Sequence, residues 1–506
     1  MFVVTLPKSA RKNPLSFARK ARKAGADILE IRGDLTPRIR GFKSPLPILL
    51  SLRGALISRF SKINFEYLDL ELNETIPVGL KRSVKIIRSF HDYKKTPTLA
   101  ELKSIEKKLR ALNPWAVKIA VTVRSYADLR ILERFRDSIH GKRSVVLGMG
   151  PRAHLNRMLS PLKDVLTYTY LEEGEQAAEG QVPLSLYRLV KHCKKPSLFG
   201  LLGGLDVRSL SPLIHNTLFK IHRIDALYFL ALTDDLDDAW KNLNELNVEG
   251  FSVTSPWKRD IVHKLDSFLL EDGHRAPRRG APKDFYCLGQ VLRTWERVSD
   301  PRKRVVRFLC GHHPDKEGKK MISVNTAVKT RNIWTGYARD AEGLLKGYDC
   351  LRKAKSACIL GSGGVVPEVV RALRLAGISD IRIFARNASA RLELATALKV
   401  GHGSLQEAVK TRPDIFIYAM NADVDIPLVV ARKGSHAIDL RYGRQTRFLS
   451  AAKKAGYKVH DGIAMLLSQA LAQFQLFTGI KPSAKDRKVL KELLATISSS
   501  SNRTNR

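Results

Sequence analysis

The chain has 506 residues, of which 44% are hydrophobic, so it is too long for one ordinary domain and too apolar for a wholly disordered protein. Its 88 lysines and arginines exceed its 49 acids by a formal charge of +39, which favours anionic partners such as metabolites, nucleic acids or membrane surfaces. No stretch reaches about eighteen uninterrupted apolar residues, which excludes a membrane-spanning helix. Phe2 already enters an apparent strand, so we expect no targeting peptide.

The cysteines and the basic residues are both scattered along the chain. An odd number of dispersed cysteines favours reduced thiols in a cytoplasmic protein over a disulfide framework. The sequence has no zinc-finger spacing and no aromatic RNA-binding motif, so we expect a solvated basic surface with no nucleic-acid partner. A basic nucleic-acid-binding protein on an enzyme-like scaffold remains the alternative from another class.

Eight strand-like segments follow one another in the first third of the chain. They alternate with helical patterns such as residues 99–112, where leucine and isoleucine recur at helical spacing. Apolar strands that alternate with helices predict a parallel sheet, and eight such units predict a closed (β/α)8 TIM barrel. The segments are residues 2–6, 26–32, 47–53, 65–72, 84–90, 116–123, 144–149 and 165–171.

Polar residues cluster at the carboxyl ends of these strands, where the active site of such a barrel lies. Lys118 stands among aliphatic residues of the sixth strand, so burial would lower its pKa and favour the neutral amine, which attacks carbonyls. His91 follows the fifth strand and can carry protons for that chemistry. Arg32, Arg53 and Arg157 can hold a carboxylate through forked hydrogen bonds.

Four motifs in residues 1–193 resemble type I 3-dehydroquinate dehydratase: "LEIRGDL", "SFHDYKKTP", "VKIAV" and "EGQ". The resemblance implies that Lys118 forms a Schiff base with the substrate ketone and that His91 is the general acid and base. It also implies that Glu30, Arg32, Arg53, Arg157 and Gln181 position the substrate. The chain departs from the family where Ala177 replaces a substrate-binding serine, and where the stretch after Arg53 lacks the acidic and Gly-Gly features often seen there.

The pattern starts again after residue 196 with a strand, glycines and a serine-rich turn. Ser209 and Ser211 are two positions apart, so both hydroxyls can face one carboxylate, although a helix cap explains them equally well. Further motifs are "GFSVTSPWKRD", "SVNTAV" and "GYARDAEG", which contain Thr254, Lys258, Asn325 and Asp340.

Residues 356–366, "SACILGSGGVV", lead from a strand through a glycine-rich turn into a helix, which is the context of a dinucleotide-binding fold. Gly361, Gly363 and Gly364 would let a pyrophosphate approach the helix N-terminus. The next strand ends in Arg386 rather than in an acid, which favours the 2′-phosphate of NADP.

Together these motifs resemble shikimate dehydrogenase over about residues 197–480. The resemblance implies that Lys258 and Asp340 are the catalytic pair, with NADPH as the hydride donor. It places Ser209, Ser211, Thr254, Asn325, Tyr442 and Gln469 at the substrate. The chain departs from this family at Arg208, Ser252, Ala338, Arg339, Ala385 and Asn387.

We therefore predict an α/β chain of four parts: a TIM barrel (1–194), a substrate-binding domain (197–350), a Rossmann-like NADP-binding domain with a closing helix (351–480) and a C-terminal helix with a disordered tail (481–506). Its predicted function is a fused enzyme of the shikimate pathway, which leads to chorismate and the aromatic amino acids. It would dehydrate 3-dehydroquinate and then reduce 3-dehydroshikimate with NADPH. We expect anionic substrates, no metal and no membrane contact, and leave monomer or homodimer open. A chain with an active dehydratase and a degenerate dehydrogenase is the alternative.

A basic segment at about residues 270–320 has no counterpart in the second family. It contains proline and glycine and is weakly periodic, so we expect an irregular surface excursion. Cys310, His312 and His313 could contact a metal together with Cys287, but their spacing matches no strong zinc pattern.

Overall fold

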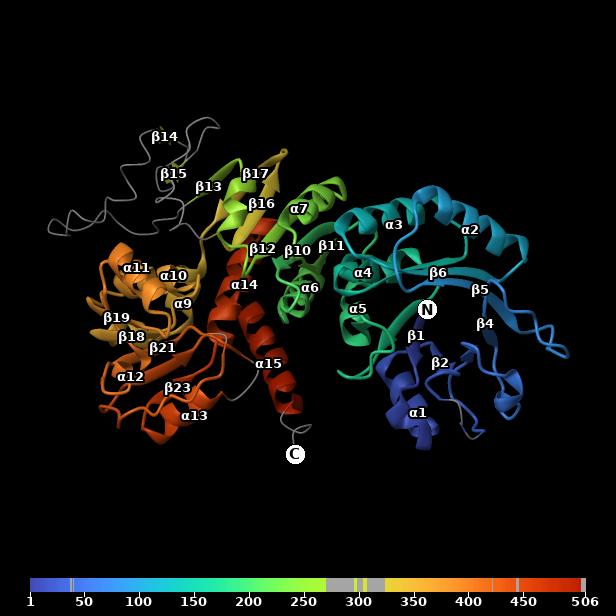
Figure 1. Cartoon of the computed structure of the whole chain (residues 1–506), viewed down its shortest axis with the longest axis horizontal. Helices are drawn as coiled ribbons and strands as arrows, with labels where there is room; N and C mark the ends of the chain where they lie inside the picture. Colours follow the sequence, from blue (N-terminus) through green and yellow to red (C-terminus); the bar gives the residue numbers. More distant parts are fainter. Residues whose placement is uncertain are drawn as a thin grey trace. The chain divides into compact units, whose positions relative to one another are not determined.

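The computed structural model describes residues 1–36, 39, 41–269, 295–297, 304–306, 324–420, 422–442 and 446–501. These residues belong to two compact units, Met1–Glu249 and Gly250–Arg506 (Figure 1). Most of the predicted basic excursion lies outside the described residues, and so do its cysteines and histidines. Its described part consists of two short paired strands, β14 (Trp295–Arg297) and β15 (Arg304–Val306).

The first unit is built on a sheet of parallel strands in the order β7-β6-β5-β4-β3-β2-β1-β8-β9. The strand residues are mostly apolar, as a parallel sheet with both faces buried requires. The predicted series of eight parallel strands is confirmed as β1–β8, and the short strand β9 is a ninth that we did not predict. The strands are β1 (Phe2–Thr5), β2 (Ile28–Arg32), β3 (Ile48–Ser51), β4 (Tyr67–Glu71), β5 (Lys85–Asp92), β6 (Ala116–Thr122), β7 (Ser144–Met149), β8 (Thr167–Tyr170) and β9 (Val182–Pro183).

The sheet differs from the predicted closed (β/α)8 ring in two respects. Strand β7 remains at an edge, and a backbone hydrogen bond from Val165 N to Ser144 O (3.0 Å) links the start of β7 to the residues before β8 without a ladder. Within the described residues, no α-helix follows β2, β3 or β4; the 3₁₀-helix η2 (Ile57–Phe60) stands after β3. Prolines at 37, 45 and 47 oppose a helix in the first of these connections, since proline lacks the amide that a helix interior needs.

Five helices cover the remaining strands: α1 (Pro14–Ala24), α2 (Leu99–Ala111), α3 (Tyr126–Ser138), α4 (His154–Lys163) and α5 (Leu184–Val190). Helix α2 begins where Thr98 and Glu101 form a reciprocal capping box, and it buries Leu102 and Leu109. The helix predicted from the leucine spacing of residues 99–112 is therefore confirmed.

The first unit continues beyond the barrel into β10 (Ser197–Gly203), α6 (Ser211–Ile221), β11 (Ala226–Leu232) and α7 (Leu236–Glu245). Helix α7 packs on α3, β11 packs on α4, and α6 packs on α5 (Figure 1). Asp238 of α7 accepts hydrogen bonds from the backbone of Tyr126 (2.6 Å) and Ala127 (3.2 Å) at the N-terminus of α3. Residues 1–194, which we assigned to the barrel, are thus part of a larger compact unit.

The second unit combines a small mixed sheet with a nucleotide-binding-type sheet. In the first, β12 (Val248–Val253) pairs antiparallel with β16 (Thr326–Thr330), which pairs with β17 (Ile333–Tyr337) and through it with β13 (Ser267–Leu269). The second is parallel throughout, in the order β20-β19-β18-β21-β22-β23. Its strands are β18 (Ser356–Leu360), β19 (Asp380–Phe384), β20 (Gly401–Gly403), β21 (Ile415–Tyr418), β22 (His436–Asp439) and β23 (Lys458–His460).

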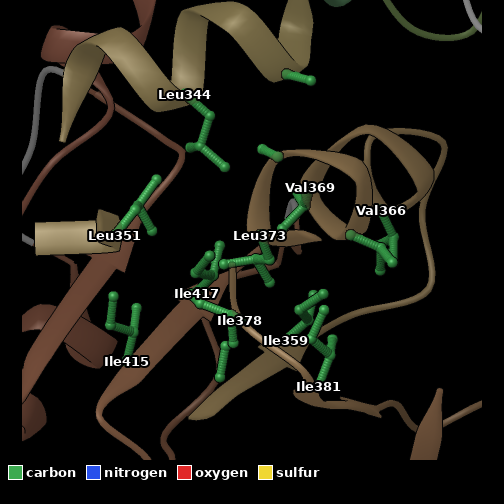
Figure 2. Packing of buried hydrophobic residues seen from close by; sticks show 14 of the residues in the cluster. Leu344, Leu351, Ile359, Val366, Val369, Leu373, Ile378, Ile381, Ile415 and Ile417 are labelled. Atoms are coloured by element: carbon green, nitrogen blue, oxygen red, sulfur yellow. The ribbon is translucent and has the colours of Figure 1, made fainter. Parts of the chain in front are cut away.

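The parallel sheet packs against helices through one apolar cluster. Figure 2 shows Leu344 of α9 (Asp340–Gly347), and Val369 and Leu373 of α10 (Val366–Leu375), directed toward Ile359 and Ile417 of the central strands. This core holds α9 against the sheet and thereby positions Asp340, the first residue of that helix. Helices α11 (Ala388–Leu398), α12 (Leu405–Ala408) and α13 (Arg447–Lys454), and the 3₁₀-helix η6 (Asp349–Lys353), complete the lobe.

Two further helices end the chain, α14 (Ile463–Thr478) and α15 (Ala484–Ser501). The C-terminal helix that we predicted is present, but it continues into the serine run at 498–501 that we expected to be disordered. Across the described part of the chain, no helix is both long enough and apolar enough to span a membrane.

Candidate active sites

The carboxyl ends of the first sheet surround a cavity of about 340 Å³. Because parallel strands end at one edge, the sheet brings together residues that lie far apart in sequence. All seven dehydratase residues selected from the sequence line this cavity: Glu30, Arg32, Arg53, His91, Lys118, Arg157 and Gln181.

Lys118 is enclosed at the bottom of the cavity, with only 3% of its side chain exposed. Its Nζ lies 2.7 Å from Asp69 Oδ2 on β4 and 4.2 Å from the ring centre of Tyr168 on β8. Burial lowers the pKa of Lys118, and the attraction of Asp69 offsets only part of that effect. Burial alone would raise the pKa of Asp69, but the charges of Lys118, Arg53 and His91 lower it to about 2.

His91 lies between two charged side chains. Its Nδ1 is 2.6 Å from Glu71 Oε1, and its Nε2 is 2.7 Å from Arg53 Nη2. Burial lowers the pKa of His91; Glu71 opposes this shift, whereas Lys118 and Arg53 add to it. A lowered pKa favours the neutral imidazole, which can accept a proton.

The remaining residues of this site are held by hydrogen bonds. Glu30 accepts from the hydroxyls of Thr5 (2.5 Å) and Ser51 (2.8 Å), so its carboxylate is fixed although it is buried. Arg157 donates to Gly148 O at 2.6 Å. Ala177 lacks the hydroxyl expected at its position.

The backbone of Ala177 still takes part in the site. Its carbonyl accepts from Arg32 Nη1 at 3.3 Å, and its amide donates to Gln181 Oε1 at 2.7 Å. The loop that carries Ala177 therefore still orients two of the predicted substrate-binding side chains.

Our sequence reasoning missed Asp69, Glu71, Tyr93 and Tyr168. Asp69 and Glu71 stand two positions apart in the fourth strand, "FEYLDLEL", so they lie on one face of it and contact Lys118 and His91. Two acids at alternate positions near the carboxyl end of this strand were the signal that could have revealed them.

A second lysine–carboxylate pair lies in the second unit. Lys258 Nζ forms an ion pair with Asp340 Oδ2; the lysine side chain is 15% exposed and the aspartate 2%. The other oxygen of Asp340 accepts from Asn325 Nδ2 (2.7 Å) and from Gln469 Nε2 (2.5 Å). The structure thus joins four of the dehydrogenase residues selected from the sequence into one hydrogen-bonded group.

Several neighbours keep this group in place. Gly343 of α9 allows α14 to come close, because a Cβ at this position would lie 2.6 Å from Gln469 Cγ. Ser252, where the family has an asparagine, donates to Gln473 Oε1 at 2.8 Å. Gln473 in turn donates to the carbonyl of Asn325 at 3.2 Å, so the departure at Ser252 leaves a continuous network.

The remaining residues predicted to bind the dehydrogenase substrate lie outside that group. Thr254 follows β12, and Tyr442 follows β22 and is half-buried. Ser209 and Ser211 belong to the first unit, where Ser209 Oγ is 3.0 Å from Ser211 Oγ and accepts from the Ser211 amide at 3.1 Å. In that unit the two serines therefore form a turn at the start of α6.

The turn between β18 and α10 fits a dinucleotide. Gly361 has φ +132°, and a Cβ there would lie 2.6 Å from Ala419 O, so only glycine suits this position. A Cβ at Gly364 would meet nothing within 4 Å, and Gly363 is nearly as open. Helix α10 has no side-chain cap; its first amide, of Val366, donates to Gly363 O at 3.0 Å, and its second residue, Pro367, has no amide hydrogen. Arg386 is exposed after β19.

One group of possible metal ligands occurs among the described residues: Cys350, His436 and His460. His436 Nδ1 and His460 Nε2 are 2.9 Å apart. Two nitrogen ligands of one tetrahedral zinc ion would be roughly 3.3 Å apart. The spacing matches a direct hydrogen bond between the two rings, so we assign no metal to this group.

Comparisons with known proteins give the class of both halves. Residues 47–190 match the model of the type I 3-dehydroquinase family, and residues 203–271 match the shikimate dehydrogenase substrate binding domain. The chain is therefore a fusion of a type I 3-dehydroquinase and a shikimate dehydrogenase, two enzymes of the shikimate pathway.

Some relatives match one half of the chain, and others match nearly all of it. The bifunctional 3-dehydroquinate dehydratase/shikimate dehydrogenase of Arabidopsis thaliana is 24% identical over an alignment that covers 92% of this chain and 80% of the relative. The NADP(+) shikimate dehydrogenase of Caldanaerobacter subterraneus is 28% identical over 56% of this chain and 91% of its own length. A solved S. pombe AroM structure of both enzymes covers 95% of this chain and 96% of its own, with 19% identity and a TM-score of 0.41.

Proposed function

We propose that the first site dehydrates 3-dehydroquinate through a Schiff base on Lys118. The observation that carries this proposal is an enclosed lysine, 3% exposed, in one cavity with His91, whose pKa is lowered by burial. The lowered pKa of Lys118 favours the neutral amine. Asp69 can stabilise the lysine nitrogen when it is protonated. His91 removes the proton next to the imine carbon and returns it to the departing hydroxyl, so that water leaves.

The arginines and polar groups at the rim would bind the substrate. Arg32, Arg53 and Arg157 are the cations of the cavity and suit its carboxylate; Glu30 and Gln181 suit its hydroxyls. These three arginines converge on a cavity of metabolite size, which favours a small anion over the nucleic-acid alternative.

At the second site, we propose that Lys258 and Asp340 handle the proton while 3-dehydroshikimate is reduced to shikimate. Asn325 and Gln469 fix Asp340, and Ser209, Ser211, Thr254 and Tyr442 would bind the substrate. NADPH would supply the hydride, with Gly361, Gly363 and Gly364 at its pyrophosphate and Arg386 at its 2′-phosphate. The intact network around Asp340 favours an active dehydrogenase over a degenerate one.

The domain assignment and the cellular setting are part of the same proposal. Residues 1–194 would act as the dehydratase, 197–350 as the substrate-binding domain, 351–480 as the NADP domain and 481–506 as a C-terminal extension. Neither reaction as proposed uses a metal. Free thiols at Cys193, Cys350 and Cys358 agree with a cytoplasmic location.

The test uses the purified full-length chain with 3-dehydroquinate. Borohydride should trap a covalent adduct on Lys118, located by peptide mass, and addition of NADPH should convert the product to shikimate with loss of NADPH absorbance. An active dehydratase that yields no adduct would exclude the Schiff base. Dehydration without any NADPH consumption, even when 3-dehydroshikimate is supplied directly, would establish the degenerate alternative.

A further inference from the structure

The general base of the first site has a carboxylate on one ring nitrogen and a guanidinium on the other. Glu71 Oε1 is 2.6 Å from His91 Nδ1, and Arg53 Nη2 is 2.7 Å from His91 Nε2. The same Glu71 oxygen is 3.0 Å from Arg53 Nη1, so the carboxylate contacts both partners. The His91 side chain is only 5% exposed, which leaves the ring few alternatives.

These contacts decide which nitrogen carries the proton. A guanidinium has donors and no acceptor, so the Arg53 contact requires a lone pair on Nε2. The single proton of the neutral ring is then on Nδ1, beside Glu71. The Glu71 contact at 2.6 Å raises the pKa of His91, although Nδ1 and the carboxylate are not well aligned for a hydrogen bond.

Glu71 is itself held firmly. Its amide donates to Glu74 Oε2 at 2.8 Å, and its carbonyl accepts from Arg88 Nη1 at 3.2 Å, so the end of β4 is fixed on both sides. Strand alternation puts Glu71 on the same face as Asp69. One strand therefore supplies a carboxylate to each reactive side chain, Asp69 to Lys118 and Glu71 to His91.

We propose that Glu71 is the positioning residue of the dehydratase. It keeps the proton of neutral His91 on Nδ1, leaves Nε2 as the base, and stabilises the imidazolium formed during the reaction. This proposal rests on the proposed function of the first site. Arg53 leaves Nε2 when the substrate carboxylate binds it, because a carboxylate is the stronger partner for a guanidinium.

The proton balance is simple. The C–H bond next to the imine breaks, its electrons remain as the enamine, and the proton passes to Nε2 of His91. The imidazolium then returns this proton to the departing hydroxyl, the C–O bond breaks, and water leaves. Glu71 takes no proton in either step, but its negative charge lowers the energy of the state in which His91 is positive.

The electrostatic effect has a definite sign. The charged or titratable groups that face His91 are Glu71 and Asp69 from β4, Lys118 from β6, Arg53 after β3 and Tyr93 after β5. Glu71 and Asp69 raise the pKa of His91, and Lys118 and Arg53 lower it. Removal of the Glu71 charge therefore lowers the pKa of His91 further, and the acidic limb of kcat/KM moves to lower pH.

The test compares Glu71→Gln with Glu71→Asp and with Glu172→Gln in the full-length chain. Glu172 also stands at this end of the barrel, but it pairs with exposed Lys20 and does not line the cavity. We expect Glu71→Gln to lower kcat about 100-fold and to move the acidic limb down by about half a unit to one unit. Glu71→Asp should recover part of both, and Glu172→Gln should behave as wild type.

Borohydride trapping separates this proposal from the proposed function. Glu71→Gln should still form the Lys118 adduct, because imine formation requires the amine rather than the orientation of His91. A wild-type pH profile with unchanged kcat in Glu71→Gln would overturn the role of Glu71 and leave the Schiff base intact. If Glu71→Gln does not fold, the pH profile of Glu71→Asp decides: an acidic limb at the wild-type position overturns the proposal.

Discussion

The two lysine–carboxylate pairs of this chain look alike but are built differently. Lys118 and Asp69 both project from strands of one sheet, and their side chains are 3% and 2% exposed. Lys258 lies in a loop after β12, and Asp340 is the first residue of a helix; their side chains are 15% and 2% exposed. Both side chains of the first pair are buried, whereas the second pair combines a partly exposed lysine with a buried aspartate.

This difference suits the two proposed reactions. A lysine that must become a neutral nucleophile benefits from full burial, which lowers its pKa. A lysine that moves a proton to or from a substrate oxygen has to be reachable from the substrate, so partial exposure suits it. Asp340 needs no second cation, because the amides of Asn325 and Gln469 hold its other oxygen.

The strongest test of the comparison is Lys118→Ala. Without the amine no imine can form, so dehydration should fall by about 10⁴-fold or more, while reduction of 3-dehydroshikimate stays within about twofold of wild type. Steady-state assays of each step and adduct mass measure both effects. A variant that loses both activities together would show that the two sites depend on one another.

The second test is Asp340→Asn, with Glu342→Gln on the same helix as its control. The amide cannot pair with the charge of Lys258, so the dehydrogenase kcat should fall about 10²- to 10³-fold. Glu342 pairs with Arg339 and Lys346 instead, and its variant should retain the rate. Dehydratase activity should be unchanged in both, and an unimpaired Asp340→Asn dehydrogenase would contradict the proposed pair.

A third test concerns the packing of the barrel on residues 197–249, which distinguishes the first unit from an isolated barrel. His154 of α4 accepts from the amide of Leu230 at 3.3 Å, and burial lowers its pKa from 6.5 to about 4, although the residue as a whole is only partly buried. The unfolded chain therefore binds this proton more readily, and stability falls as the pH drops from 6.5 towards 4.

Between pH 7 and pH 5 the loss should be about 2 kcal/mol, an order-of-magnitude value. His154→Gln should remove this part of the pH dependence. This pH dependence is measured by urea unfolding, with loss of dehydratase activity as the readout. An equal pH dependence of stability in wild type and variant would refute the role of His154.

The smallest effect is expected from Asp238→Ala. Asp238 of α7 accepts from two amides at the N-terminus of α3, so its removal should cost about 1 kcal/mol of unfolding free energy in the first unit. Asp238→Asn retains an acceptor oxygen and should cost less. Thermal unfolding of the full chain provides the measurement; equal stability of Ala, Asn and wild type would contradict a capping role.

Much of the first site could be predicted because its residues stand at the ends of apolar strands. Once the parallel sheet is inferred, His91 and Lys118 must end near one another, and the register Ser89 opposite Lys118 shows that β5 and β6 are direct neighbours. Asp69 and Glu71 were missed because an acid inside a strand has no evident partner until the opposite strands are placed.

The helical layer was harder to predict than the strands. The connections after β2, β3 and β4 have no α-helix in the described chain, so the repeating unit inferred from strand spacing breaks down there. The extension of α15 to Ser501 was likewise missed, because serine is only a moderate helix former.

The sequence by itself determined the strands, the glycine-rich turn and most of the reactive side chains, because apolar periodicity and motif spacing are local properties of the chain. Only the tertiary structure decided which carboxylate faces which base. Asp69 with Lys118, Glu71 with His91 and Asp340 with Asn325 and Gln469 are contacts between separate elements. Burial, and with it the pKa of each group, depends on the atoms that the fold packs around it.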